Sequence, residues 1–349
     1  MRILYQIPSI NTIYAGRTIY YGYRHAFEDL GHAFRPLTAD DNPKEILTEF
    51  KPDVLFTSLN SYNLKYLPAE SVKIYKKHGT KIFVNIPFWK SPMSKLRINE
   101  TPSISEKEDY VKLIKSGDYG DVYFNNCERG DCRMEDFEKT TGYRHYTVLL
   151  AADKTISAPK FSKKFACDVS FIGTYLPEKR KFIQEYVLPL KEKYNLRLYG
   201  RDWTALDRFL NIIHRAGQYY NIPYLRSFKK YKPTLEEERQ IHRSSTIALN
   251  IHEDYQKKDL GDLNERTFKI PISGGFEIVD NVPSLSKYFK DGEELIIAKD
   301  KKDWFEKIDY YIRNPNKRLP IIEAGKKKVL KDHTYHNRVR QLLSIYEDL

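Results

Sequence analysis

The chain has 349 residues, which is enough for two domains of ordinary size rather than one core. Hydrophobic residues make up 41% and aromatic residues 14%, and this composition excludes a disordered chain. No run of 18 apolar residues occurs, and the N-terminal sequence MRILYQIPSI lacks an apolar signal core. The sequence therefore predicts neither secretion nor a transmembrane anchor.

The formal net charge is +12, which favours contact with a polyanion. Nucleic acid, an anionic membrane surface, an anionic polymer and a nucleotide are all compatible with this charge, as is a basic surface with no such partner. The three cysteines, Cys127, Cys132 and Cys167, form no CxxC pair and have no zinc-like His spacing. We therefore expect no disulfide framework, no metal site and a reducing, cytoplasmic location.

The first half of the chain alternates apolar strands with polar helical stretches, of which 18–30 is the clearest. The expected strands cover 2–7, 52–59, 80–87 and 121–126. This alternation is typical of an α/β domain with a parallel sheet covered on both faces. Ligands of such sheets bind beyond the carboxyl ends of the strands. The loops there offer Gly16, Arg17 and Asn85 as acceptor-side candidates.

A second alternation follows the lysine-rich stretch 146–166, which we take as the domain boundary. Helices are expected over 177–194, 234–244, 303–314, 315–331 and 333–349, and strands over 167–172, 195–200, 246–252, 276–279 and 293–298. The stretch 202–233 is rich in tyrosine and basic residues and is predicted to be an insertion or an irregular helix-loop. The sequence shows no internal repeat.

Residues 249–280 are the candidate site of an anionic ligand. A strand ends at His252, a polar loop follows, and a helix opens near Asn264. The first N–H groups of a helix have no partner within it and attract anions such as phosphate. Arg266 lies in that first turn, where an acidic residue is more usual, which favours a bound anion.

The loop after 167–172 offers further candidates, Gly173 and Thr174, followed by the helical sequence PEKRK. Arg180 is the favoured cation there, although Lys179 and its neighbours are interchangeable at the level of sequence. The simpler alternative is a tight turn at Gly173 and a solvated face.

Three further segments each offer a ligand-binding interpretation and a purely structural one. Tyr199 and Gly200 follow a strand end, where either a base or sugar lies or a tyrosine packs before a turn. Gly274 and Gly275, followed by Phe276, either let a ligand approach the backbone or end the helix. His252 is either a ligand at a strand end or a core histidine.

Several segments together resemble the CgeB-like (spore maturation protein) glycosyltransferases, which belong with the group 1 glycosyltransferases of GT-B fold. These segments are CDVSFIG at 167–173, RLYGRDW at 197–203, LNIH at 249–252, DLNERTFKIPISGGFEIVDN at 262–281 and KDHTYHNRVRQLL at 331–343. The resemblance covers roughly the C-terminal half. It implies two Rossmann-like domains facing a central cleft, with an acceptor domain at 1–155, a donor domain at 156–334 and a last helix at 335–349 that packs back on the first domain.

The resemblance also implies roles for residues, with Arg266 and His252 as the catalytic candidates. The donor, a nucleotide sugar, would contact Gly173, Thr174, Arg180, Tyr199, Gly200, Asn250, Asn264, Glu265, Gly274, Gly275 and Phe276. Helix N-termini and basic side chains would stabilise the leaving diphosphate without a metal ion or other cofactor.

The sequence departs from the family at Lys269, where an acidic residue usually binds the donor ribose. Gly261 stands where the other acid of the common pair would lie. A lysine has no acceptor for ribose hydroxyls, so Glu265 or Glu277 is the candidate replacement.

Three functional interpretations follow. The first is a nucleotide-sugar-dependent glycosyltransferase acting on a large acceptor such as a protein or surface polymer. The second keeps the chemistry but modifies DNA, with lysines contacting phosphates. The third is a non-catalytic basic binding module that retains the fold. The sequence assigns no general base and no stereochemical outcome.

Overall fold

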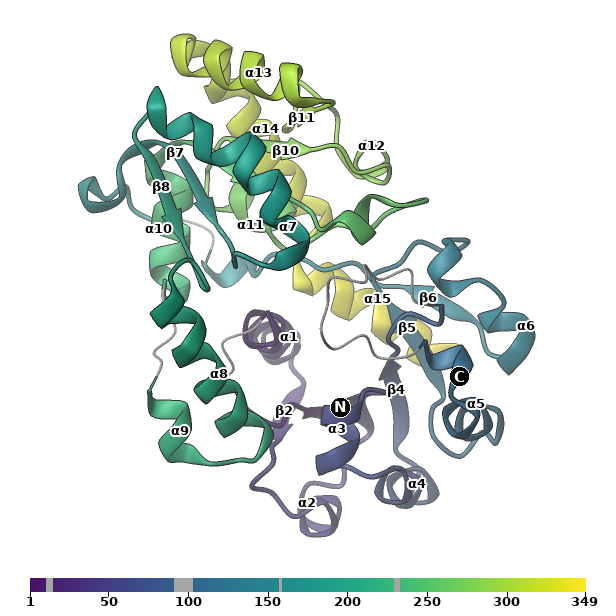
Figure 1. The fold of residues 1–349 in the computed structure, drawn as a ribbon. Coiled ribbons are helices and arrows are strands. Elements are labelled where there is room, and N and C mark those ends of the chain that lie inside the picture. Colours follow the sequence, from purple (N-terminus) through teal and green to yellow (C-terminus); the bar gives the residue numbers. More distant parts are fainter. Residues whose placement is uncertain (11–14, 91–102, 157–158, 229–232) are drawn as a thin grey trace. The chain divides into compact units, whose positions relative to one another are not determined.

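The computed structural model describes residues 1–10, 15–90, 103–156, 159–228 and 233–349. The chain forms two compact units (Figure 1). Unit 1 contains the described residues up to Leu149 together with Arg338–Leu349, and unit 2 contains those from Leu150 to Asn337. The end of the chain thus belongs to the unit in which the chain begins. Within unit 1, Arg338 Nε donates to Leu149 O at 3.0 Å and Gln341 Nε2 to Thr147 O at 2.8 Å.

The described part of unit 1 is built on a six-stranded parallel sheet in the order β2-β1-β3-β4-β5-β6. The strands are β1 Arg2–Gln6, β2 Ala33–Leu37, β3 Val54–Ser58, β4 Lys81–Asn85, β5 Val122–Asn125 and β6 His145–Thr147. The sequence prediction omitted β2. This strand is short and half-exposed at the sheet edge and contains Pro36, so it lacks a continuous apolar pattern.

Helices connect the strands of unit 1. They are α1 Gly16–Asp29, α2 Pro43–Phe50, α3 Ser61–Tyr66, α4 Ala69–Lys77, α5 Glu108–Lys115 and α6 Phe137–Thr141. Helix α1 packs an aromatic face on the sheet, where the ring of Tyr23 lies 5.8 Å from Tyr5 and 6.2 Å from Phe56. The last helix, α15 Tyr335–Glu347, begins in unit 2 and continues into unit 1 from Arg338.

The described part of unit 2 contains a five-stranded parallel sheet in the order β11-β10-β9-β7-β8. The strands are β7 Cys167–Ile172, β8 Leu196–Tyr199, β9 Ser245–Asn250, β10 Glu277–Asp280 and β11 Ile296–Ala298. The chain passes from β7 to β8 on one side and later returns as β9 on the other. The carboxyl ends of β7 and β9 therefore form the topological switch point, where ligands of such sheets bind.

The helices of unit 2 are α7 Pro177–Phe182, α8 Ala205–Tyr219, α9 Pro223–Ser227, α10 Leu235–Ser244, α11 Arg266–Ile272, α12 Leu285–Tyr288, α13 Lys301–Arg313 and α14 Pro315–Asp332. Two of them differ from the sequence prediction. Helix α7 is short and is followed by a π-helical turn, Ile183–Val187, and a 3-10 helix that contains Pro189, Leu188–Glu192. The sequence predicts one long helix over this stretch. The stretch expected to be irregular contains α8, a regular helix of 15 residues.

Among the described residues, no helix combines the length and apolar character needed to cross a bilayer.

Candidate functional site

Arg266, the first residue of α11, joins the two strands of the switch point in unit 2. Its Nη1 donates to Ile172 O at the end of β7 at 3.2 Å, and its Nη2 donates to Ile251 O just beyond β9 at 2.7 Å. Its Nε donates to Asn250 Oδ1 at 3.1 Å. These bonds use three of the five N–H groups of the guanidinium. Arg266 thus holds its charge at the edge of the sheet where a Rossmann-like domain binds ligands.

Asn250 fixes the orientation of Arg266 from the end of β9. Its Nδ2 donates to Thr267 Oγ1 at 3.0 Å and to Glu277 Oε1 at 2.8 Å, so its Oδ1 points toward the guanidinium. Asn264 Nδ2 donates to the same Oδ1 at 2.8 Å. The sequence predictions for Asn250, Asn264 and Arg266 therefore fall on three residues that the structure brings together, with Asn250 as a positioning residue.

Lys179 supplies a second buried cation to this site. It lies on α7, only 6% exposed, with its Nζ 3.5 Å from Glu253 Oε1. Burial, followed by the charge of Arg266, lowers the pKa of Lys179 to about 8. Sequence reasoning favoured Arg180 instead, but Arg180 is exposed and its guanidinium lies over the Tyr175 ring at 5.3 Å. In the sequence, the best indication for Lys179 over Arg180 would have been the helical periodicity, which places residue 179 on the buried side of the helix.

His252, the other catalytic candidate, is held by two contacts inside unit 2. Its Nδ1 is 2.8 Å from Asp280 Oδ1, and its Nε2 accepts the Asn264 backbone N–H at 3.2 Å. Both ring nitrogens are thus used inside the unit, and burial lowers the pKa of His252 despite the neighbouring Asp280. A neutral histidine with two satisfied nitrogens orders the loop before α11, which favours the core-histidine alternative, and the catalytic role remains a prediction.

The N-terminus of α11 is also more occupied than the sequence prediction assumed. The helix begins at Arg266 rather than at Asn264, and it has seven residues. Asn264 Oδ1 accepts the Arg266 backbone N–H at 2.9 Å, while the Asn264 N–H is engaged by His252. Positive charge at this site therefore comes mainly from the side chains of Arg266 and Lys179.

Gly173 and Gly200 form a close backbone contact between the ends of β7 and β8. Gly173 N–H donates to Tyr199 O at 2.9 Å, and a Cβ on Gly200 would lie 2.3 Å from Gly173 O. Gly200 also has a φ of +112°, which favours glycine. Trp203 Nε1 donates to Gly173 O at 3.1 Å. Gly173 is therefore a packed turn, and it leaves the half-exposed Thr174 as the next loop residue toward solvent.

Tyr199, Gly274, Gly275 and Phe276 agree with their structural alternatives. The Tyr199 ring packs 6.3 Å from that of Phe165. Gly274, with φ +71°, and Gly275 end α11 by donating to Pro271 O and Ile270 O, and a Cβ on Gly275 would lie 2.7 Å from His242 O. Phe276 is buried beside Tyr311. Each of these residues thus has a packing role, and its predicted donor contact remains a prediction.

Lys269, the departure from the family pattern, lies in a buried ionic network. Its Nζ is 3.3 Å from Glu238 Oε1 on α10 and 3.2 Å from Glu265 Oε2. Tyr335 Oη donates to Glu265 Oε1 at 3.2 Å. Burial opposes ionisation of Glu238, but Lys269 reverses this and lowers its pKa. Burial raises the pKa of Glu265, which shares the Lys269 ammonium with Glu238, so contacts inside the unit account for Glu265 without a ribose contact.

The other candidate replacement, Glu277, is also internal. It is 2% exposed and bound to Asn250, and burial raises its pKa to about 8. Its carboxyl group is therefore protonated at neutral pH and supports Asn250 rather than a ligand.

The acceptor-side candidates lie in unit 1. Gly16 is the first residue of α1, and Arg17 follows it with its guanidinium 6.0 Å from the Tyr21 ring. Asn85 is exposed at the carboxyl end of β4, and its backbone oxygen accepts the Ser58 hydroxyl at 2.8 Å. These positions agree with the expected edge of the sheet and remain predictions as acceptor contacts.

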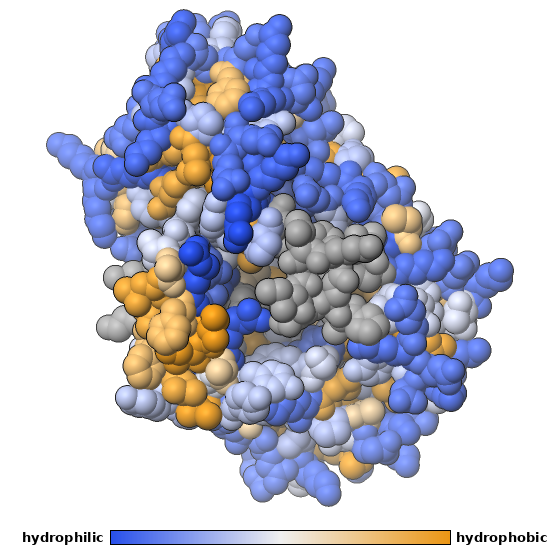
Figure 2. Space-filling model, in the orientation of Figure 1, coloured by the Kyte–Doolittle hydropathy of each residue, from blue (hydrophilic) through white to orange (hydrophobic). Residues whose placement is uncertain are grey.

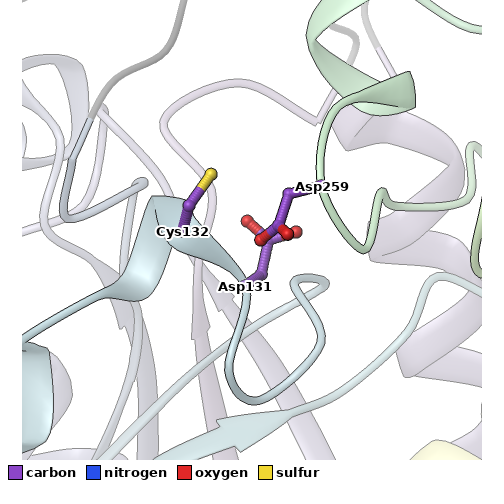
Figure 3. Close-up of side chains that lie close together, drawn as sticks. All are labelled: Asp131, Cys132 and Asp259. Carbon is purple, nitrogen blue, oxygen red and sulfur yellow. The ribbon is translucent and has the colours of Figure 1, made fainter.

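Figure 3 shows Asp131, Cys132 and Asp259, three side chains of types that bind metals. Asp131 and Cys132 belong to unit 1 and Asp259 to unit 2. Within unit 1, the Asp131 carboxylate is already paired with Arg133, with Nε–Oδ1 at 2.7 Å and Nη2–Oδ2 at 2.8 Å, and both side chains are fully buried. Because a guanidinium already neutralises this carboxylate, we assign no metal site to these residues.

Several solved structures share the architecture of the whole chain. HepE from Anabaena, solved with UDP-glucose, matches over 100% of both chains with a TM-score of 0.61 and 11% identity. Sucrose-phosphate synthase from Thermosynechococcus elongatus matches over 99% of this chain and 98% of its own, with a TM-score of 0.66 and 10% identity. An alpha-glucosyltransferase in complex with UDP-glucose and DNA containing an abasic site matches over 99% of each chain, with a TM-score of 0.67 and 12% identity. The fold is GT-B.

The sequence comparison adds a family to this GT-B fold. Residues 179–344, just under half of the chain, match the model of a family described as glycosyl transferase-like. No curated protein matches the chain. The chain is therefore similar to a glycosyl transferase-like family over residues 179–344, and the solved structures show its fold.

The protonated state of Glu277 predicts a pH dependence of stability. Between about pH 4.3, the ordinary pKa of glutamate, and pH 8, the folded chain keeps a proton that the unfolded chain has lost. The free energy of unfolding therefore falls as pH rises through this window, by at most about 1.4 kcal/mol per pH unit. Glu277→Gln does not titrate, so its stability relative to the natural chain should increase from pH 5 to pH 8 in urea unfolding. A difference that is constant with pH would contradict the buried, protonated carboxyl.

The buried ammonium of Lys179 predicts the opposite sign. The unfolded chain binds this proton more tightly than the folded chain between pH 8 and about pH 10.4, so its burial costs stability most at neutral pH. Lys179→Met should therefore raise the free energy of unfolding at pH 7 by roughly 1 to 3 kcal/mol, with less gain at pH 10.

Lys181→Met, on the exposed side of the same helix, is the matched control. It should change stability by less than about 0.5 kcal/mol. Equal effects of the two substitutions would show that Lys179 is not held as a buried charge.

Proposed function

We propose that this chain transfers a sugar from a nucleotide-sugar donor whose diphosphate binds at Arg266 and Lys179. The observation that carries the proposal is the placement of two cations, the half-buried Arg266 and the buried Lys179, at the carboxyl ends of β7 and β9 in unit 2. The two cations repel each other; Glu253 and Asp280 are carboxylates that act on both, and Glu238 and Glu265 also act on Arg266. A bound diphosphate would add negative charge beside both cations.

The same cations suit the chemistry of the step. The bond between the anomeric carbon and the diphosphate oxygen breaks and the diphosphate leaves with the electron pair. The acceptor hydroxyl oxygen bonds to that carbon, and its proton passes to the departing diphosphate or to water. Negative charge grows on the leaving oxygens, where fixed cations stabilise the transition state more than the ground state. We propose that Arg266 and Lys179 do this without a metal ion.

UDP-glucose is the first donor to test, because HepE and the alpha-glucosyltransferase were both solved with it. The proposed acceptor is a large molecule such as a protein or surface polymer, and the proposed location is the cytoplasm, consistent with three free cysteines. The CgeB-like subtype also belongs to this proposal and rests on the motifs at 262–281 and 331–343.

Modification of DNA is a second candidate, favoured by the net charge of +12 and by the neighbour solved with DNA. Transfer of labelled glucose to hydroxylated duplex DNA, lost as salt is raised, would select it over a protein or polymer acceptor. The sequence favoured a non-catalytic module mainly because Lys269 replaces an acid. The structure gives Lys269 a packing and charge-pairing role, so that argument is weaker.

The donor site is tested by ligand-induced stabilisation and by Arg266→Ala. UDP, GDP, ADP or dTDP should raise the melting temperature of the natural chain, since a ligand that binds only the folded state stabilises it. Arg266→Ala should weaken binding of the stabilising diphosphate by about 30-fold, or roughly 2 kcal/mol, and the matching nucleoside by much less.

Arg243→Ala is the matched control, because Arg243 is an exposed arginine of unit 2 that donates to Gly274 O at 3.2 Å. It should leave both affinities unchanged. If no nucleotide diphosphate shifted the melting temperature, the transferase proposal would fail. If Arg266→Ala weakened nucleoside and diphosphate binding equally, Arg266 would lose the proposed role.

A further inference from the structure

Helix α8 of unit 2 has an inverted polarity. The side it buries carries polar or small residues, namely Asn211, His214, Gly217 and Gln218. Its outward side carries large apolar residues, and Leu206, Phe209 and Ile212 are 67%, 59% and 64% exposed. A surface helix of a globular protein normally turns its apolar stripe to the core. The folding of unit 2 therefore does not account for the apolar side of α8.

The orientation of α8 is fixed by its contacts with α9. A Cβ on Gly217 would lie 2.8 Å from the Arg226 backbone nitrogen, so the two helices meet where only glycine fits. His214 Nδ1 is 2.9 Å from Arg226 O, and Asn211 Nδ2 donates to Asp202 Oδ1 at 3.1 Å. These bonds would be lost if α8 rotated to bury Phe209 and Ile212.

The apolar surface continues beyond α8. The turn and α9 expose Tyr219, Tyr220, Ile222, Tyr224 and Phe228. Figure 2 shows apolar residues gathered over these two helices, which Figure 1 draws as a helical hairpin. A contiguous exposed apolar patch of this kind marks an interaction surface.

Positive charge accompanies the apolar residues. Arg208 and Arg215 are exposed and lie seven residues apart, so they share one flank of the outward side. In sequence, residues 201–232 contain seven basic and two acidic side chains. The two acids, Asp202 and Asp207, are engaged locally, Asp202 by Asn211 and Asp207 by the Asp202 backbone N–H.

We propose that the hairpin formed by α8 and α9 docks on an anionic membrane surface. Its apolar side would enter the interface between headgroups and acyl chains, and Arg208 and Arg215 would contact lipid phosphates. Interfacial helices have this combination of aromatic and aliphatic residues with a basic flank. The proposal does not rest on the donor chemistry, because the hairpin residues take no part in the Arg266 site.

Two other occupants fit the same surface less well. A second copy of the chain would bring a second basic surface against Arg208 and Arg215, and a net charge of +12 adds general repulsion. A nucleic acid would bind through cations and stacked aromatic rings, but Leu206, Ile212 and Ile222 provide neither. An anionic lipid surface complements both the charge and the aliphatic residues.

Vesicle sedimentation of the full chain tests the proposal. Vesicles of phosphatidylcholine mixed with phosphatidylglycerol should bind the chain, and vesicles of phosphatidylcholine alone should bind it at least about tenfold more weakly. The double variant F209Q/I212Q should lose at least about tenfold in affinity for the anionic vesicles. R208Q/R215Q should lose the preference for anionic lipid and its sensitivity to salt.

Leu319→Gln is the matched control, because Leu319 on α14 is 60% exposed outside the hairpin. It should bind vesicles like the natural chain. If nucleotides stabilise F209Q/I212Q against heat as much as they stabilise the natural chain, the variant is folded. If the chain binds vesicles but no nucleotide, the membrane proposal still holds and only the donor proposal fails.

Three results would overturn the proposal. One is vesicle binding that F209Q/I212Q leaves unchanged. Another is self-association of the natural chain in sedimentation equilibrium that the double variant abolishes, without vesicle binding. The third is binding of a duplex oligonucleotide, rather than vesicles, that depends on Phe209 and Ile212.

Discussion

The site of unit 2 depends on one guanidinium placed between two strand ends. Arg266 donates to the backbone oxygen of the last residue of β7 and to that of the residue after β9, so it links the ends of these neighbouring strands. Its pKa is lowered by burial although four carboxylates surround it. The guanidinium is therefore held in place by its hydrogen bonds, and its charge is only partly solvated by water. A residue so placed holds two strand ends together, and its remaining N–H groups keep fixed directions in which the proposed diphosphate could be bound.

The alternation of strands and helices could be predicted from the sequence because both sheets are parallel and buried, and such strands appear as continuous apolar runs. Strand β2 was missed because it lies at an edge and contains Pro36. Helix α8 falls in the stretch predicted to be an insertion or an irregular helix-loop. Its apolar residues follow a helical period with a polar side opposite, but the structure buries the polar side and exposes the apolar side, which the sequence pattern does not reveal.

The candidate site was predictable in its location but not in its details. Asn250, Asn264 and Arg266 fall near strand ends and a helix start, which the sequence marks clearly. The choice between Lys179 and Arg180 depends on the phase of a helix that begins at Pro177, and a one-residue uncertainty exchanges a buried for an exposed side chain. The role of His252 depends on Asp280, which lies 28 positions further along the chain. Such pairings are set by sheet order, which local pattern does not contain.

Lys269 shows how an apparent loss of function in a sequence can be a local exchange of charge. Read alone, a lysine in place of an acid removes an acceptor for a ribose. In the structure, Glu238 from α10 and Glu265 from the preceding turn lie on either side of its ammonium, and Tyr335 satisfies the remaining oxygen of Glu265. Removing Lys269 would leave two buried carboxylates without their cation, which is unfavourable. The network therefore ties α10, α11 and the start of α15 together, and the anion site beside it is left with a cationic rather than an acidic character.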